Sequence, residues 1–218
     1  MVISNTSLDG TTPDMCIVEL GDGRRGVFKC IDVKHSIMME NQYEKVARFF
    51  RLPVSPCIEV DGGFVSIISY NRRYKQISSY DICESNTFNE YRKVLPESVY
   101  KRILLLAFVD AITNSGDRHS GNIAFLQNAS GHIVDICPVY DNVVCLSGSY
   151  NNEALLVPDS DKLWTHAEVY KWLACNMENF KELYSRYNSI EFTNLIHTLP
   201  DGELMYNIRN EFNTIINI

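Results

Sequence analysis

Asp117 and Asn122 lie five positions apart in a short polar segment, residues 116–122, that directly follows a long apolar stretch. Phosphoryl transfer needs a carboxylate that orients the attacking hydroxyl and accepts its proton. It also needs a nearby oxygen ligand that shares a metal ion with a second carboxylate. Asp and Asn are common turn residues as well, so a purely structural role is the alternative. The whole arrangement favours a catalytic base at Asp117 and a catalytic metal ligand at Asn122.

The second carboxylate has two candidates further along the chain. Asp135 stands in a short apolar-rich stretch, residues 132–135, and Asp141 follows Pro138-Val139-Tyr140. A protein-bound Mg²⁺ takes one or two carboxylates and completes its shell with phosphate oxygens and water. Either aspartate satisfies that requirement, so the residue types leave the choice open.

Lys29 stands on an alternating strand pattern with Val27 and Ile31 on the same face. A lysine between two apolar neighbours is unusual unless an anion pairs with its ammonium group. The phosphates of ATP would serve, and Glu40 or Glu44 in the following helical pattern could hold the lysine. A plain edge-strand lysine is the alternative.

Two glycine-containing segments compete for the role of a phosphate-binding loop. Residues 21–26 fit the pattern G-x-G-x-x-G, but Lys29 follows only three residues later, which leaves no strand between loop and lysine. We therefore interpret 21–26 as a hairpin turn. The preferred loop is 7–13, whose small residues offer backbone amides and hydroxyls to phosphates.

Histidine and cysteine do not indicate a metal cluster. His119 is expected to order its polar loop, and the other four histidines form no ligand spacing. The seven cysteines include no C-x-x-C pair, which argues against a zinc cluster and against a secreted disulfide framework.

The elements that must position these residues change character along the chain. Strand patterns cover 15–20, 26–31, 57–60 and 64–70, with a helical pattern at 37–50 that Pro53 and Pro56 are expected to close. Afterwards a long apolar helix is expected at 97–114, ended by Gly116, then short strands at 123–126 and 133–136, and helices from 161 onward. The sequence predicts an α+β, bilobal fold with a β-rich N-lobe (1–70), a helical C-lobe (71–218) and the site between them.

Composition narrows the functional classes. The 218 residues are 45% hydrophobic and 22% charged, which is ordinary globular composition, and the net charge of -7 argues against non-specific nucleic-acid binding. Neither a signal peptide nor a membrane-spanning stretch is visible, so a cytoplasmic location is expected.

Taken together, these segments resemble the HipA-like branch of the protein-kinase-like superfamily, over roughly residues 7–145. The matching segments are Gly10-Thr11-Thr12-Pro13, Phe28-Lys29, Glu40-Asn41 with Leu52-Pro53-Val54, Tyr70-Asn71-Arg72-Arg73, 116–122 and Pro138-Val139-Tyr140-Asp141-Asn142. The last two segments are the specific part of the resemblance.

The resemblance implies a compact ATP-dependent serine/threonine protein kinase that uses Mg²⁺ or Mn²⁺. It assigns Asp117 as the base, Asn122 and Asp141 as metal ligands, and Lys29 as the ligand of the α- and β-phosphates. The remaining nucleotide-binding positions that it implies are Gly10, Thr11, Thr12, Glu40, Ile68 and Tyr70. The chain has no room for the additional N-terminal domain of the longer toxin members, which leaves toxin activity and an antitoxin-type partner open.

Two alternatives remain. Phosphoinositide lipid kinases also carry Gly-Asp-Arg-His-x-x-Asn, and there the metal carboxylate follows at about the distance of Asp135, although Asp135-Ile136-Cys137 stands in place of their Asp-Phe-Gly. A kinase that phosphorylates a small molecule is part of the same enzymatic alternative. A nucleotide-binding pseudokinase that acts as an interaction module is the non-enzymatic reading, and the retention of Lys29, Asp117, Asn122 and Asp141 argues against it.

Overall fold

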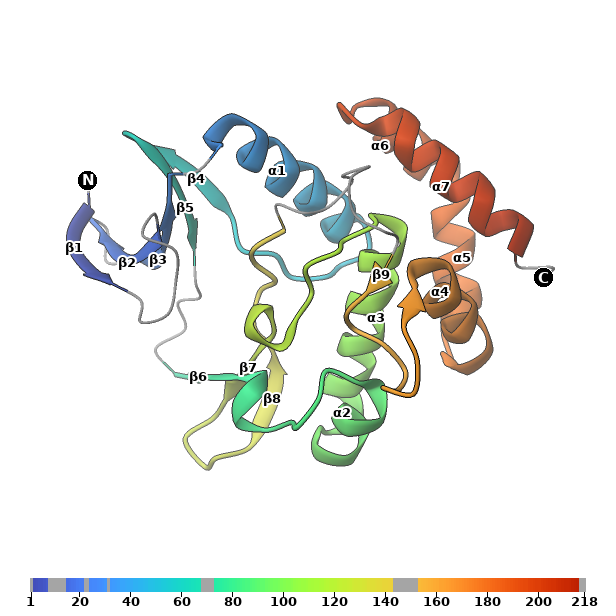
Figure 1. The fold of residues 1–218 in the computed structure, drawn as a ribbon, viewed down its shortest axis with the longest axis horizontal. Coiled ribbons are helices and arrows are strands. Elements are labelled where there is room, and N and C mark those ends of the chain that lie inside the picture. Colours follow the sequence, from blue (N-terminus) through green and yellow to red (C-terminus); the bar gives the residue numbers. More distant parts are fainter. Residues whose placement is uncertain are drawn as a thin grey trace.

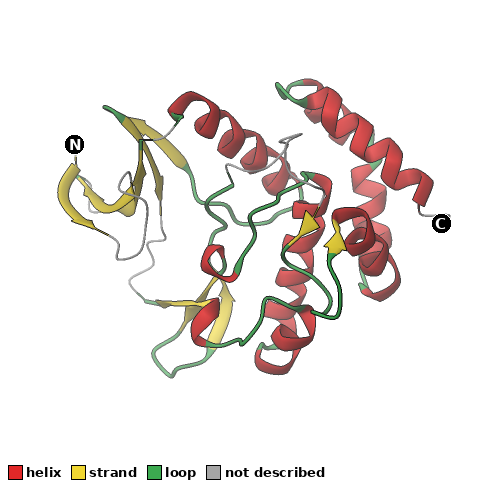
Figure 2. Cartoon of the chain, viewed as in Figure 1, coloured by secondary structure: helices red, strands yellow, loops and turns green. Residues whose placement is uncertain are grey.

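The computed structural model describes residues 2–7, 15–21, 24–30, 32–67, 73–142 and 153–215. An antiparallel sheet lies at the N-terminal end of the molecule and a group of helices at the C-terminal end (Figures 1 and 2). The fold is mixed α+β, as the sequence predicted. No helix within the described ranges is both long and apolar enough to span a membrane.

The N-terminal sheet contains five antiparallel strands in the order β1-β2-β3-β5-β4. Their bounds are Val2–Ser7 (β1), Met15–Leu20 (β2), Arg25–Lys29 (β3), Cys57–Val60 (β4) and Gly63–Ile67 (β5). The hairpins β2–β3 and β4–β5 confirm the two turn predictions. Strand β1 was missed, so the preferred phosphate loop falls between two paired strands in the sequence, and 15–20 is not the first strand.

Helix α1 spans Val33–Phe49 and lies between the sheet and the C-terminal helices (Figure 1). It ends within one residue of the predicted end, and Arg51 follows in a left-handed conformation with φ of 62°. Its start lies four residues before the predicted residue 37. Its buried side chains, Met39, Tyr43, Val46 and Ala47, join the large hydrophobic core of the C-terminal part. The sheet has a separate cluster of its own, Val18, Leu20, Val65 and Ile67, which we call the sheet cluster.

Helix α3, Glu97–Ile112, runs through the large core and is buried on nearly all sides, as its apolar composition predicted. Gly116 does not end it: the helix stops at Ile112, and Asn114 takes the left-handed conformation with φ of 48°. Asn tolerates that conformation better than most residues, because its side chain can hydrogen-bond locally.

The strands β6 (Lys75–Ser78), β7 (Ala124–Gln127) and β8 (Ile133–Ile136) form a three-stranded sheet beside α3. The other elements are η1 (Ser79–Asp81), α2 (Phe88–Val94), η2 (Ser120–Asn122), β9 (Glu153–Ala154), β10 (Trp164–Thr165), α4 (His166–Asn176), α5 (Phe180–Tyr187), α6 (Ile190–His197) and α7 (Gly202–Ile215). The prediction lacked β6, α2, β9 and β10.

Candidate active site

Lys29 and Asp141 form an ion pair between two segments that are 112 residues apart in the sequence. Lys29 ends β3 and is only 8% exposed, while Asp141 follows β8 in the left-handed conformation with φ of 59°. The sequence predicted that phosphate oxygens would pair with this lysine and that Glu40 or Glu44 would hold it. In the structure its ion pair is with Asp141 instead. The pair joins the N-terminal sheet to the loops of the C-terminal part.

Glu40 lies directly beside this pair, on the buried face of α1. It is 2% exposed, and its carboxylate accepts hydrogen bonds from the backbone N–H of Asn142 at 3.0 Å and from the Asn142 Nδ2 at 2.8 Å. Burial raises the pKa of Glu40, and the neighbouring Asn142 and Lys29 oppose that rise. Glu44, the other candidate, forms an ion pair with Arg48 toward the surface, so Glu40 is the glutamate that faces Lys29 and Asp141.

Asp117 and Asn122 occupy the loop between α3 and β7. Asn122 is buried and its Nδ2 donates to the backbone oxygen of Asp117 at 2.8 Å. Within the described residues this leaves its amide oxygen available as an acceptor. Partial burial raises the pKa of Asp117, His119 opposes the rise, and Asp141 adds to it. The structure therefore brings the three oxygen-bearing residues Asp117, Asn122 and Asp141 into one region.

His119 orders this loop, as the sequence suggested. Its Nδ1 accepts a hydrogen bond from the N–H of Gly121 at 3.0 Å, and its Nε2 lies 3.8 Å from the Oδ1 of Asp117. A β-carbon on Gly121 would lie 2.7 Å from the His119 ring and 3.3 Å from the ring of the exposed Tyr80. Only glycine fits between these rings without displacing one of them.

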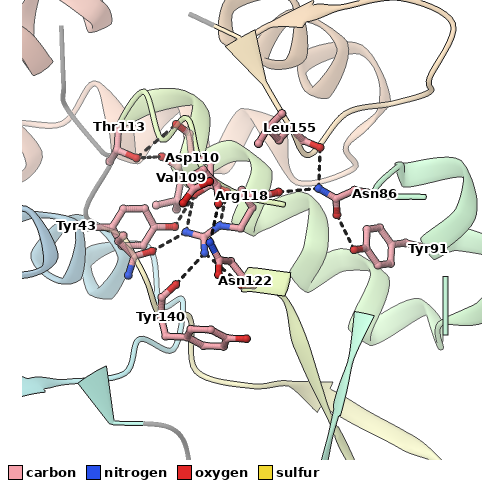
Figure 3. Close-up of polar contacts among 12 residues, drawn as sticks. Tyr43, Asn86, Tyr91, Val109, Asp110, Thr113, Arg118, Asn122, Tyr140 and Leu155 are labelled. Carbon is pink, nitrogen blue, oxygen red and sulfur yellow. Dashed lines mark hydrogen bonds and ion pairs between the residues drawn. The ribbon is translucent and has the colours of Figure 1, made fainter. Parts of the chain in front are cut away.

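Arg118 is buried beneath the site and holds its loops together through hydrogen bonds. The sequence analysis did not identify it. The guanidinium is 1% exposed and pairs with both carboxylate oxygens of Asp110, at 3.0 and 3.2 Å (Figure 3). It also donates to the backbone oxygens of Asn122 and Tyr140 and to the side-chain oxygen of Asn142. The available signal was Asp110, a carboxylate within an apolar helix, because a buried charge requires a partner.

Asp135 lies on β8, away from the lysine. Its side chain accepts a hydrogen bond from the N–H of Ile136 at 2.8 Å and lies 3.8 Å from Arg102 at the surface of α3. The residue types left the choice between these two carboxylates open and the resemblance favoured Asp141; in the structure Asp141 is the one that pairs with Lys29.

Several predicted nucleotide-binding residues, Gly10, Thr11, Thr12, Ile68 and Tyr70, lie outside the described residues. The competing glycine segment contains the turn of the β2–β3 hairpin, where the N–H of Leu20 donates to the oxygen of Arg24 at 2.7 Å. That position fits the predicted turn.

The donor set fits a hard divalent cation. Asp141 offers a carboxylate and Asn122 an amide oxygen, which are ligand types that Mg²⁺ accepts. The described ranges hold no group of three His, Cys, Asp or Glu side chains arranged for a metal. A site that takes the rest of its oxygens from phosphates needs no such group.

Comparisons with known proteins identify solved structures that have a similar fold. The structure is similar to the Helicobacter pylori proinflammatory kinase CtkA, with a TM-score of 0.67 and 13% identity, over 99% of this chain and 92% of that one. It is also similar to HipA from a Shewanella oneidensis toxin–antitoxin complex with HipB and operator DNA, with a TM-score of 0.54 and 15% identity, over 88% of this chain and 56% of that one. No protein-family model and no curated protein matches the sequence. The chain has a HipA-like, protein-kinase-like fold.

Proposed function

We propose that this chain is an ATP-dependent phosphotransferase that transfers the γ-phosphate to a serine or threonine hydroxyl of a protein. The observation that carries the proposal is the Lys29–Asp141 ion pair, with Asp117 and Asn122 in the adjacent loop. A buried lysine and an aspartate from distant segments lie together there, and phosphoryl transfer requires a cation for the phosphates and an anion for the metal ion.

Each residue then has a defined role. Lys29 binds the α- and β-phosphates, Asp141 and Asn122 hold Mg²⁺ or Mn²⁺, and Asp117 orients the acceptor hydroxyl and takes its proton. The metal ion, when bound, neutralises charge on the phosphate oxygens. Glu40 fixes the position of Asn142, and through it the backbone next to Asp141.

One observation favours a protein acceptor over a lipid. The lipid-kinase reading requires Asp135 as the metal carboxylate, and Asp135 instead lies 3.8 Å from Arg102. The side chain of Asp117 is 39% exposed, so an acceptor hydroxyl can reach the proposed base.

The test is phosphotransfer by the purified chain with γ-labelled ATP and Mg²⁺, alone and with a protein extract. Asp117→Asn should abolish transfer and leave ATP affinity largely intact, because the base contacts the acceptor rather than the nucleotide. Asp141→Asn should abolish transfer and weaken Mg²⁺-dependent ATP binding, measured as the shift of the thermal unfolding midpoint.

Asp135→Asn is the matched control, since it makes the same chemical change on β8 and should retain most of the activity. An inactive Asp135→Asn beside an active Asp141→Asn would instead support the lipid-kinase-like reading. Binding of ATP without transfer to any acceptor would support the pseudokinase reading.

A further inference from the structure

Asn86 lies just before α2, and its side chain uses all of its polar groups on three partners. Its Nδ2 donates to the backbone oxygen of Arg118 at 2.6 Å and to that of Leu155 at 2.7 Å. Its Oδ1 accepts from the hydroxyl of Tyr91 at 2.7 Å, and that hydroxyl contacts Ser79 at 2.6 Å. One amide thus joins the catalytic loop, the segment after β9 and helix α2 (Figure 3).

The segment after β9 is bound to the same place by its backbone. Thr87 and Val157 form a parallel β-bridge, and the N–H of Phe88 donates to the oxygen of Val157 at 2.8 Å. Residues 155–157 are therefore fixed to the start of α2, with Asn86 between them and the catalytic loop.

Arg118 is consequently held at two ends. Its guanidinium is bound on the core side by Asp110, and its carbonyl is bound on the opposite side by Asn86 (Figure 3). With both ends fixed, the peptide plane between Arg118 and His119 cannot rotate freely. Asp117 directly precedes this residue, so the direction of the proposed base depends on both attachments.

We propose that Asn86 is a positioning residue that sets the orientation of Asp117 and couples the catalytic loop to residues 155–157. The expected effect on kcat rests on the proposed function. The coupling between the two segments does not, and hydrogen exchange can test it separately. Asn86 contacts neither Lys29 nor Asp141 among its hydrogen bonds, so its effect should fall on transfer rather than on nucleotide binding.

The test is Asn86→Asp, which keeps the size of the side chain and places a carboxylate against two carbonyl oxygens. We expect kcat to fall by about 10- to 100-fold, the loss typical of a misplaced reacting group, with little change in the KM for ATP. Hydrogen exchange should accelerate in peptides covering 117–123 and 153–158 together, and remain unchanged in α3.

Asn89→Asp is the matched control, because it makes the same change at an exposed position three residues away on α2. It should leave kcat and exchange at the wild-type values. If Asn86→Asp fails to fold, Tyr91→Phe removes only the hydroxyl that orients Asn86, and it should lower kcat by about fivefold, the equivalent of one hydrogen bond.

Unchanged kcat in both variants would overturn the proposal, and so would faster exchange in one of the two segments without the other. If the wild-type chain transfers no phosphate, only the proposed function is refuted. Hydrogen exchange in peptides covering 117–123 and 153–158 would still show whether Asn86 couples the two segments.

Discussion

Arg118 connects parts of the site that are distant in the sequence. Its guanidinium contacts Asp110 on α3 and Asn142 after β8, and lies 5.6 Å from the ring centre of Tyr43 on α1. The planar group reaches several acceptors at once, which the single ammonium group of a lysine cannot do. The planar shape of the guanidinium, in addition to its charge, therefore determines which groups Arg118 can hold.

Arg118→Lys should therefore destabilise the protein and stop transfer although the charge is kept. Asp110 would lose its two-point contact inside the core, and we expect a loss of roughly 2 kcal/mol or more in the free energy of unfolding, by analogy with broken buried ion pairs. Chemical denaturation measures this loss. Arg102→Lys, at a partly exposed arginine of α3, is the control, and equal stability losses in the two variants would contradict the argument.

At the scale of residues, the sequence identified groups that react and missed groups that support them. Lys29 was identified because a charge on an apolar strand face requires a partner, whereas Glu40 and Glu44 remained equal candidates for holding it. Asn86 had no such signal, because asparagine before a helix is ordinary turn chemistry. Its partners are backbone oxygens of residues 118 and 155, which only the folded chain brings to it.

At the scale of elements, the strand that carries Lys29 lies unusually close to its neighbour β5. A β-carbon on Gly26 would lie 2.4 Å from the Cγ1 of Val65 and 2.6 Å from the backbone oxygen of Ser66. The glycine thus permits the register in which Lys29 pairs with Phe64. The geometry of β3 depends on a residue that has no side chain.

Gly26→Ala should push β3 away from β5 and displace Lys29. We expect a destabilisation of about 1–3 kcal/mol, as for other overpacked sites, and a weaker affinity for ATP. Gly62→Ala is the control: it strains a turn residue with φ of 78° but has open space around it, so it should cost stability without changing the affinity. Unaltered ATP binding by Gly26→Ala would show that the strand adapts.

Long elements were easier to predict than short ones for a physical reason. Helix α3 shows its burial in sixteen consecutive residues, whereas β9 and β10 contain two residues each. Such short strands form only because their partners are already in place, and local sequence preference contributes little. The end of α1 was predicted within one residue, but α1 begins at Val33, four residues before the predicted start. Helix α3 ends two residues before the predicted 114, where Asn114 adopts a left-handed conformation that no glycine marks.

At the scale of the whole molecule, His166 should make stability depend on pH. It is buried at the start of α4, and within the described part of the chain its Nε2 has no hydrogen-bond partner. Burial lowers its pKa from 6.5 to about 4, opposed by the nearby Asp110. The unfolded chain then binds a proton more readily than the folded one, so stability is full above pH 6.5 and falls toward pH 4.

His166→Leu should remove this dependence. The difference in unfolding free energy between wild type and variant should change by about 3 kcal/mol between pH 7 and pH 4, at 1.36 kcal/mol for each unit of pKa shift. Denaturant titrations across that range measure it. His132→Gln, at an exposed histidine, should leave the pH profile as it is, and an identical profile for His166→Leu would rule out the assignment.

The proposed active-site residues are supported by two separate hydrophobic clusters, the sheet cluster and the large core. Lys29 belongs to a sheet supported by Val18, Leu20, Val65 and Ile67, whereas the loop of Asp117 is supported by the large core. Parts of a protein with few buried apolar contacts open more easily than its core. We therefore expect the sheet to open more easily than the catalytic loop.

Under the proposed function, nucleotide affinity would then include the free energy of closing the sheet. A ligand that binds only the closed form has an apparent affinity reduced by the fraction of molecules that are closed. Substitutions such as Val65→Ala, at a residue that need not touch the nucleotide, would weaken ATP binding and leave the rate at saturation unchanged. The packing of these four residues would then set the ATP concentration at which the protein becomes occupied.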